Sequence, residues 1–335
     1  MASPDSRVQG LHGNWAPRQK GVCSEATCKP GATIGMRFAV VKGFLVEGSS
    51  APFQKELEVA IAAALDAGSI VRDLYDRAAA ASYEKVDGSP VTDADLAADT
   101  VIRAYLTSAF PNDALLTEEG QDDTARLSNP RCWIVDPIDG TEQFIQRTGE
   151  FDVLIALVEN GYPVVGVGYQ PTTGTLVYAS KGGGAWVKRG DAEAERQFNV
   201  EPPGVPRIAT SKWFGAPGNL EILEGVAGRL GVAPLPPTVT GFAPRIFLAP
   251  RSHDAMLGIR AEGPHDMAHE WDFCAADIVI AESGGKTTDL AGNRYRYNKE
   301  RAINEGGLVV AATEAAHAHV LAAIQAEGRA RGLLP

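Results

Sequence analysis

The sequence of 335 residues is poor in cysteine, in basic residues and in long apolar runs. Its four cysteines, Cys23, Cys28, Cys132 and Cys274, are few and irregularly spaced, so they give no sign of a disulfide framework. Cys23 and Cys28 offer half of a metal site, but no second Cys/His pair with zinc spacing follows. We therefore interpret them as two thiols in a loose tail and expect a reducing, cytoplasmic location.

Acidic residues outnumber basic residues in this chain. Its 31 Lys and Arg face 42 Asp and Glu, a formal net charge of -11, which argues against a nucleic-acid polymer as the main partner. No apolar run approaches the length of a membrane-spanning helix, so no membrane partner is expected. A small anionic substrate is still compatible, because bound divalent cations would present positive charge to it.

The chain divides into an extension and two halves by composition. Residues 1–52 lack periodicity and mix Gly, Pro, Ser and charge, which predicts a disordered extension, with Met36 as an alternative start. A compositional break near Pro202-Pro203-Gly204 separates residues 53–203 from residues 204–335. Helices and strands alternate in both halves, which predicts an α/β protein.

Apolar periodicity predicts the individual elements. One helix begins after Pro52 with a possible break at Gly68. A second begins at a Thr92 N-cap, and its apolar side comprises Leu96, Ile102, Leu106 and Phe110. Further helices are expected over 219–230, 272–283 and 314–326. Strands are expected over 114–117, 133–135, 151–158, 164–169, 175–179, 185–187, 207–210, 239–242 and 308–311.

The most informative stretch is Trp133-Ile134-Val135-Asp136-Pro137-Ile138-Asp139-Gly140-Thr141. We expect the apolar strand to end at Asp136 and the following turn to direct Asp139 toward the same point. Gly140 permits an unusual backbone angle, and Thr141 is expected to cap a short helix whose free amides suit a phosphate. An ordinary strand-to-helix turn with an Asp cap is the alternative, and the whole string argues against it.

Two other acidic sites complete the pattern. Glu118 and Glu119 follow a predicted strand, and Asp272 opens a predicted helix. Taken alone, they indicate a solvated loop and a helix cap. Together with Asp136 and Asp139 they form a set of hard oxygen ligands that suits Mg²⁺. Phosphate monoesters hydrolyse so slowly that rate acceleration reaches about 10²¹-fold, and paired cations are one solution. The pattern predicts a Mg²⁺-dependent phosphatase.

Over residues 53–326 the sequence resembles the inositol monophosphatase superfamily. The string from Asp136 to Thr141 is similar to its first signature, and Trp271-Asp272-Phe273-Cys274-Ala275-Ala276 through Gly284-Gly285 is similar to its second. The resemblance implies a layered αβαβα sandwich, often dimeric, and two or three Mg²⁺ ions. Glu118, Asp136 and the Ile138 carbonyl would hold one ion, and Asp136, Asp139 and Asp272 would hold another.

The resemblance also implies roles around the metals. Glu119 would support the ligands, and Thr141 with Asp95 would orient and activate the attacking water. The amides of Gly140 and Thr141 would meet the phosphate. Lys85 matches a basic position that faces the substrate.

Two stretches, 139–151 and 295–310, look more like the 3'(2'),5'-bisphosphate nucleotidases of this superfamily than its inositol enzymes. The implied reaction converts adenosine 3',5'-bisphosphate to AMP and phosphate. Those nucleotidases carry a Gly-Ser pair and a Lys where this chain has Gly241 and Arg245, so we expect Arg245 to read the second phosphate, with Arg251 and Lys212 as other candidates. An inositol or sugar phosphatase is the alternative.

Two rival interpretations remain outside this class. His265 and His269 stand four residues apart, a spacing that binds zinc on a helix, but the neighbouring Gly263-Pro264 leaves little room for one. A non-catalytic, anion-binding relative is the other rival. A decayed site would have lost a carboxylate, and this chain retains all of them.

Overall fold

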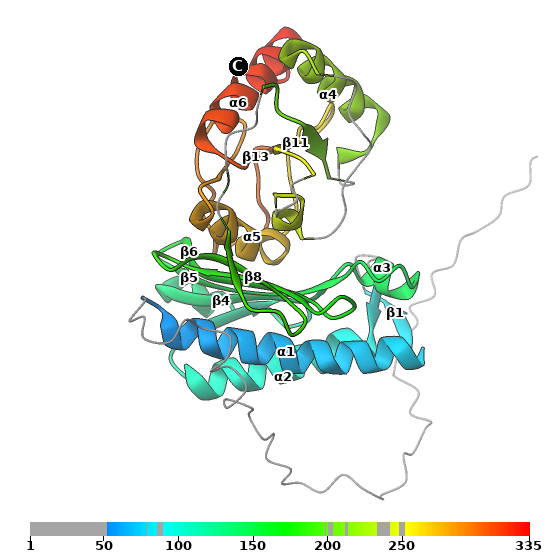
Figure 1. Ribbon diagram of the computed structural model, residues 1–335, viewed down its shortest axis with the longest axis vertical. Coiled ribbons are helices and arrows are strands. Elements are labelled where there is room, and N and C mark those ends of the chain that lie inside the picture. Colours follow the sequence, from blue (N-terminus) through cyan, green and yellow to red (C-terminus); the bar gives the residue numbers. More distant parts are fainter. Residues whose placement is uncertain are drawn as a thin grey trace, which may run out of the picture. The chain divides into compact units, whose positions relative to one another are not determined.

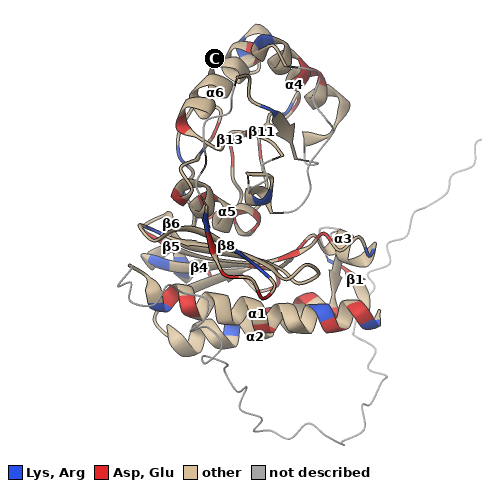
Figure 2. Ribbon diagram, in the orientation of Figure 1, with Lys and Arg blue, Asp and Glu red and all other residues tan. Residues whose placement is uncertain are grey.

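Two long helices open the described part of the chain, which in the computed structural model comprises residues 52–78, 80–85, 90–197, 199, 204–211, 214–232, 242–247 and 252–335. These residues belong to one compact unit. Helix α1 (Gln54–Arg77) runs through Gly68 without a break. Its charged residues gather toward its two ends (Figure 2), and at the C-terminal end they form the pairs Arg72–Asp76 and Arg77–Asp73.

Helix α2 (Asp93–Ala109) begins as predicted at Thr92, whose hydroxyl accepts a hydrogen bond from the amide of Ala94. The Thr92 amide in turn donates to Asp95, so the two residues form a capping box. The prediction for Leu96 is wrong: its side chain is 46% exposed. The predictions for Ile102 and Leu106 are confirmed, since the helix buries both together with Ala98 and Tyr105.

A seven-stranded sheet covers the inner side of these helices (Figure 1). The strands lie in chain order; β3 and β4 are parallel and every later pair is antiparallel. Their bounds are β3 Ala114–Thr117, β4 Arg131–Asp139, β5 Asp152–Glu159, β6 Tyr162–Gln170, β7 Thr175–Ser180, β8 Gly184–Arg189 and β9 Glu195–Gln197. A short hairpin, β1 (Ser82–Glu84) with β2 (Pro90–Thr92), precedes α2.

Strand β4 corrects one expectation. It does not end at Asp136 but continues to Asp139, with a register shift against β5 between these two residues. Pro137 lies in that irregularity, where a missing amide donor does no harm. The bulge changes the direction in which Asp139 points relative to Asp136.

The second sheet has the order β10-β11-β13-β12. Helix α5 (Glu270–Glu282) lies between the two sheets and contacts β4 to β8 on one side and β12 on the other, while α4 and α6 cover the far face of the second sheet. The remaining bounds are β10 Ile208–Thr210, α4 Pro217–Leu230, β11 Ala255–Gly258, β12 Lys286–Thr288, β13 Leu308–Ala311 and α6 Glu314–Ala330. This order of layers confirms the predicted αβαβα sandwich.

Alternation along the strands separates the core into layers. On β4, Trp133 and Val135 pack toward α1 and α2, whereas Cys132 and Ile134 pack toward α5. A third apolar cluster lies under α4 and α6. This period of two is what a sheet covered on both faces requires.

Several expectations fall outside the described residues: the extension up to residue 51, most of the strand over 239–242, and the candidates Lys212 and Arg251. The division at residues 203 and 204 stays a prediction. Within the part of the chain that is described, no helix combines the length and apolarity needed to cross a membrane.

Candidate active site

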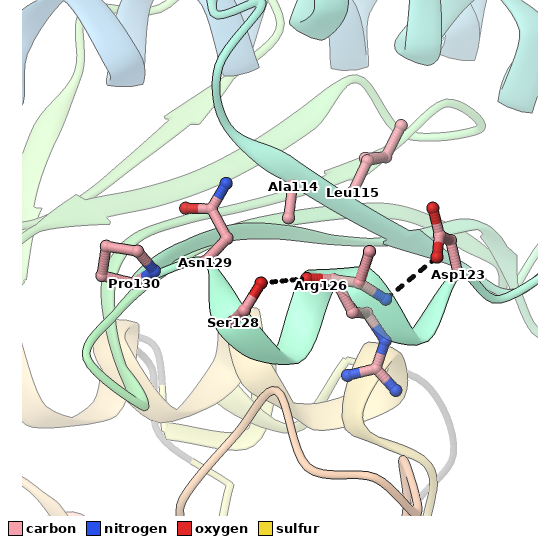
Figure 3. A pocket seen from close by; sticks show the side chains of 8 residues that line it. Ala114, Leu115, Asp123, Arg126, Ser128, Asn129 and Pro130 are labelled. Carbon is pink, nitrogen blue, oxygen red and sulfur yellow. Dashed lines mark hydrogen bonds between the residues drawn. The ribbon is translucent and has the colours of Figure 1, made fainter.

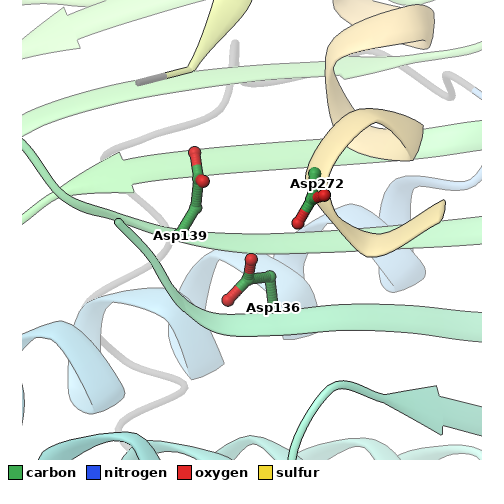
Figure 4. Close-up of side chains that lie close together, drawn as sticks. All are labelled: Asp136, Asp139 and Asp272. Atoms are coloured by element: carbon green, nitrogen blue, oxygen red, sulfur yellow. The ribbon is translucent and has the colours of Figure 1, made fainter. Parts of the chain in front are cut away.

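Three carboxylates from two elements converge at one point (Figure 4). Asp136 and Asp139 come from the bulged end of β4, and Asp272 comes from the first turn of α5. Each offers an oxygen that lies within 4.8 Å of the others. Asp136 is buried and the other two are partly exposed, so the cluster is shielded from solvent at Asp136 and accessible to it at Asp139 and Asp272. The backbone amide of His269 donates to Asp272 at 2.8 Å and fixes its side chain.

The carboxylates of this cluster disfavour one another's charge. Burial raises the pKa of Asp136 well above its usual range, and the charges of Glu118, Asp139 and Asp272 raise it further. Burial likewise raises the pKa of Asp272, with Asp139 and Glu118 adding to the effect. Such a cluster is stable in its charged form only beside a cation. A hard divalent ion fits this donor set, because every side-chain ligand is a carboxylate oxygen.

Glu118 and Glu119 lie at the end of β3, as predicted, beside the cluster. Lys85 donates to both carboxylates at 2.7 Å. Burial raises the pKa of Glu119 to about 7, although Lys85 opposes the change. Burial also acts against the charge of Lys85, but its hydrogen bonds to the two glutamates outweigh that and raise the pKa above its ordinary value. Lys85 therefore contacts the acidic residues themselves.

Thr141 is the first residue of the short helix α3 (Thr141–Ile145) rather than its cap, which corrects the expectation. Its hydroxyl donates to Asp95 at 3.0 Å and lies 3.2 Å from the Ile138 carbonyl. Asp95 also accepts hydrogen bonds from the amide and hydroxyl of Thr92 at 2.8 and 2.5 Å. Burial raises the pKa of Asp95, and these hydrogen bonds oppose the rise. Asp95 is thus held firmly against Thr141.

Gly140 takes the cap position with a φ of 98°, which only glycine adopts readily. A Cβ there would lie 2.9 Å from the backbone carbonyl of Glu150. The turn that presents Asp139 and Thr141 to one point therefore depends on this glycine.

Arg245 lies in the 3₁₀ helix η4 (Ala243–Phe247) and forms an ion pair with buried Asp152 of β5. Burial lowers the pKa of Arg245 to about 10, and the charges of Asp139 and Glu150 oppose that. Asp152 pairs across the sheet with Asp139. Asp152 is not among the residues predicted from the sequence, although a carboxylate at the start of an apolar run is a signal.

The two histidines of the zinc interpretation do not share a helix: His269 is the N-cap of α5 and His265 precedes it in a loop. Across the described ranges, the one group with metal-binding geometry is the three aspartates. The zinc interpretation therefore finds no support there.

An acidic cluster between a bulged strand and a helix, in a five-layer α/β sandwich, defines a metal-dependent type of phosphatase. The model of the inositol monophosphatase family matches residues 53–329, and the chain belongs to this family. It is a phosphatase.

Three relatives illustrate the range of similarity. The 3'(2'),5'-bisphosphate nucleotidase CysQ of Salmonella typhimurium is 40% identical over 253 residues, which cover 75% of this chain and 97% of the relative. The crystal structure of CysQ from Bacteroides thetaiotaomicron has a TM-score of 0.64 at 31% identity and covers 78% of this chain and 99% of that one. A histidinol-phosphatase of Chlorobaculum parvum is 28% identical and covers 80% of this chain and 96% of its own length.

Proposed function

We propose that the chain is a Mg²⁺-dependent 3'(2'),5'-bisphosphate nucleotidase that converts adenosine 3',5'-bisphosphate to AMP and phosphate. The observation that carries this proposal is the convergence of Asp136, Asp139 and Asp272 beside the Thr141–Asp95 pair. The similarity to CysQ proteins over most of the chain favours the nucleotide substrate over an inositol or sugar phosphate.

The acidic residues are proposed to hold two or three Mg²⁺ ions. Asp136, Asp139 and Asp272 would share one ion, and Asp136, Glu118 and the Ile138 carbonyl would share another. Bound Mg²⁺ supplies acidified water and neutralises charge on the phosphate oxygens. Glu119, held by Lys85, would keep Glu118 in place.

The chain's own residues are proposed to orient the attacking water. Because Thr141 donates its proton to Asp95, its lone pairs are left to accept a hydrogen bond from water. As the water oxygen bonds to phosphorus, one of its protons passes to Thr141 and the Thr141 proton passes to Asp95. The bond between phosphorus and the ribose oxygen breaks, and that oxygen takes a proton from solvent. The amides of Gly140 and Thr141 would hold the phosphate during this step.

Arg245 and Lys85 are the proposed substrate contacts. Arg245 pairs with Asp152 through one guanidinium nitrogen, which leaves other N–H groups to donate to a second phosphate. Lys85 lies against the metal-site glutamates and would face the scissile phosphate. A homodimer and a cytoplasmic location complete the proposal, on the strength of the family resemblance and the low cysteine content.

A substrate panel tests the proposal. With Mg²⁺ present, phosphate release is measured from adenosine 3',5'-bisphosphate, inositol 1-phosphate and fructose 1,6-bisphosphate. We expect the highest kcat/KM for the nucleotide, with AMP as the product. A higher kcat/KM for either of the other two would overturn the assignment of substrate and leave the phosphatase class intact.

A further inference from the structure

Arg126 is an arginine in an unusual setting, because it is only 3% exposed. It lies in the 3₁₀ helix η2 (Thr124–Ser128), on the segment that follows Glu118 and Glu119. Its guanidinium donates to both oxygens of Asp122 at 2.7 and 2.9 Å. Two further hydrogen bonds leave the segment: one to the Asn298 side chain at 2.7 Å and one to the Lys299 carbonyl at 2.9 Å.

Arg126 is among the residues of η2 that line a cavity of about 470 Å³ (Figure 3). Figure 3 shows its guanidinium directed away from Ala114 and Leu115, which line the same cavity. The polar lining groups Asp123 and Asn129 are engaged within the fold, with the Ala125 amide and the Asn112 carbonyl. Arg126 therefore acts on the other side of η2.

Asn298 continues the connection. It has a left-handed backbone with a φ of 60°, which asparagine tolerates better than other side chains. Its side-chain amide donates back to the Arg126 carbonyl at 3.0 Å, and its backbone amide donates to Glu270 at 2.6 Å. Asn298 thus joins η2 to the first residue of α5.

Glu270 is fully buried and receives three donors: the amides of Asn298 and Lys299 at 2.6 and 3.2 Å, and the Lys299 ammonium at 2.8 Å. It stands two residues before Asp272 in the same turn of α5. A helix turn is rigid, so fixing Glu270 also fixes the origin of the Asp272 side chain.

We propose that Arg126 is a positioning residue for Asp272, acting through Asn298 and Glu270. The inference rests on the proposed role of Asp272 in binding Mg²⁺. The like charges of Asp136, Asp139 and Asp272 push α5 away from β4, and the connection through Arg126 resists that displacement. It also ties the segment after Glu118 to α5, so that Glu118 and Asp272, which are far apart in the sequence, keep their spacing.

The test measures Mg²⁺ binding without substrate by isothermal titration calorimetry, as the Mg²⁺ concentration at the midpoint of the binding curve. Arg126→Ala removes the guanidinium bonds to Asn298 and Lys299, and Asn298→Gly removes the Asn298 side-chain bonds while keeping the left-handed backbone. Arg131→Ala is the matched control. This variant lacks the ion pairs of Arg131 with Glu56, Asp113 and Glu159, none of which involves α5. Asp272→Asn reports on the site itself.

Changing a residue that directly orients a metal ligand lowers metal affinity by about 10–100-fold. Because the connection from Arg126 to Asp272 is longer, we expect the Mg²⁺ affinity to fall by about three- to tenfold. Arg126→Ala and Asn298→Gly should raise the Mg²⁺ midpoint and recover turnover at high Mg²⁺, whereas Arg131→Ala should lower the melting temperature with an unchanged midpoint. If Arg126→Ala does not fold, Asn298→Gly decides. Unchanged midpoints in both, with a raised midpoint in Asp272→Asn, would overturn the inference and leave the proposed function standing. An unchanged midpoint in Asp272→Asn would remove the metal site and the inference with it.

Discussion

The proposed chemistry depends on the side-chain hydroxyl of Thr141. Thr141→Val keeps the shape and removes the oxygen that lies 3.0 Å from Asp95. We expect turnover at saturating Mg²⁺ to fall by about 10²-fold or more, since positioned proton transfer contributes roughly 10²–10⁴-fold. Thr141→Ser retains the hydroxyl and should keep most of the activity. Equal rates in the Val and Ser variants would take Thr141 out of the reaction.

Arg245 allows a test of substrate choice at one residue. Arg245→Ala should lower kcat/KM for adenosine 3',5'-bisphosphate by about ten- to a hundredfold, because a charge-assisted hydrogen bond contributes on the order of 1.5–3 kcal/mol. A substrate with one phosphate, such as inositol 1-phosphate, should be nearly unaffected. Asp152→Asn is the companion variant, since it removes the charge of the ion-pair partner and retains the Arg245 side chain. Equal losses on both substrates in Arg245→Ala would mean that the residue serves the fold instead.

The position of α5 depends on a small residue in the sheet beneath it. A Cβ on Gly166 of β6 would lie 2.4 Å from Ile278 Cγ2 and 2.6 Å from the Ala275 carbonyl. Gly166→Ala should therefore destabilise the protein by about 1–3 kcal/mol in urea unfolding, as overpacking does. Gly228→Ala in α4 meets open space and should stabilise by roughly 0.5–1 kcal/mol. Similar effects of the two changes would contradict the close packing of α5 on β6.

Helix α6 carries a pH-dependent contribution to stability. His317 is 2% exposed, and its ring lies 2.9 Å from the Thr288 hydroxyl. Burial lowers its pKa to about 4, with the charge of Lys286 adding to the effect. Because this value lies below that of the unfolded chain, His317 stays neutral in the folded protein. Its contribution is present above about pH 6.5 and is lost as the pH falls toward 4.

His317→Gln isolates this effect from the carboxylates, which titrate in both proteins. The stability difference between the wild type and the variant should shrink by about 2–3 kcal/mol between about pH 7.5 and pH 4.5. Urea unfolding at both pH values measures it. A difference that stays constant would show that His317 titrates normally in the folded state.

At the scale of the whole molecule, the layers follow from periodicities that the sequence displays. Alternation on β4 and the Thr92 cap of α2 were predictable, because each depends on neighbours in the chain. The acidic cluster was predictable as a set, since motif spacing places Asp136 and Asp139 near one another and the family resemblance implies Asp272 beside them. The continuation of β4 past Asp136 was not predictable from the sequence, because the bulge depends on how β4 pairs with β5.

The contacts between segments that are far apart in the sequence could not be predicted either. Lys85 reaches Glu118 and Glu119, and Arg245 reaches Asp152, only after the sheets have formed. No local pattern specifies which acid a given base will meet. These pairs adjust the charge around the site, so the sequence predicts its ligands better than its electrostatics.

We propose that this phosphatase works through Mg²⁺ held by the three aspartates. The most direct test is phosphate release from adenosine 3',5'-bisphosphate by EDTA-treated protein during titration with Mg²⁺, for the wild type, Asp139→Asn and Asp272→Asn. The wild type should be silent without metal and regain activity with Mg²⁺ but not with zinc alone. Both variants should stay folded and lose most of their turnover, because each removes one charged ligand. Full activity after complete metal removal, or a wild-type rate in either variant, would contradict the account.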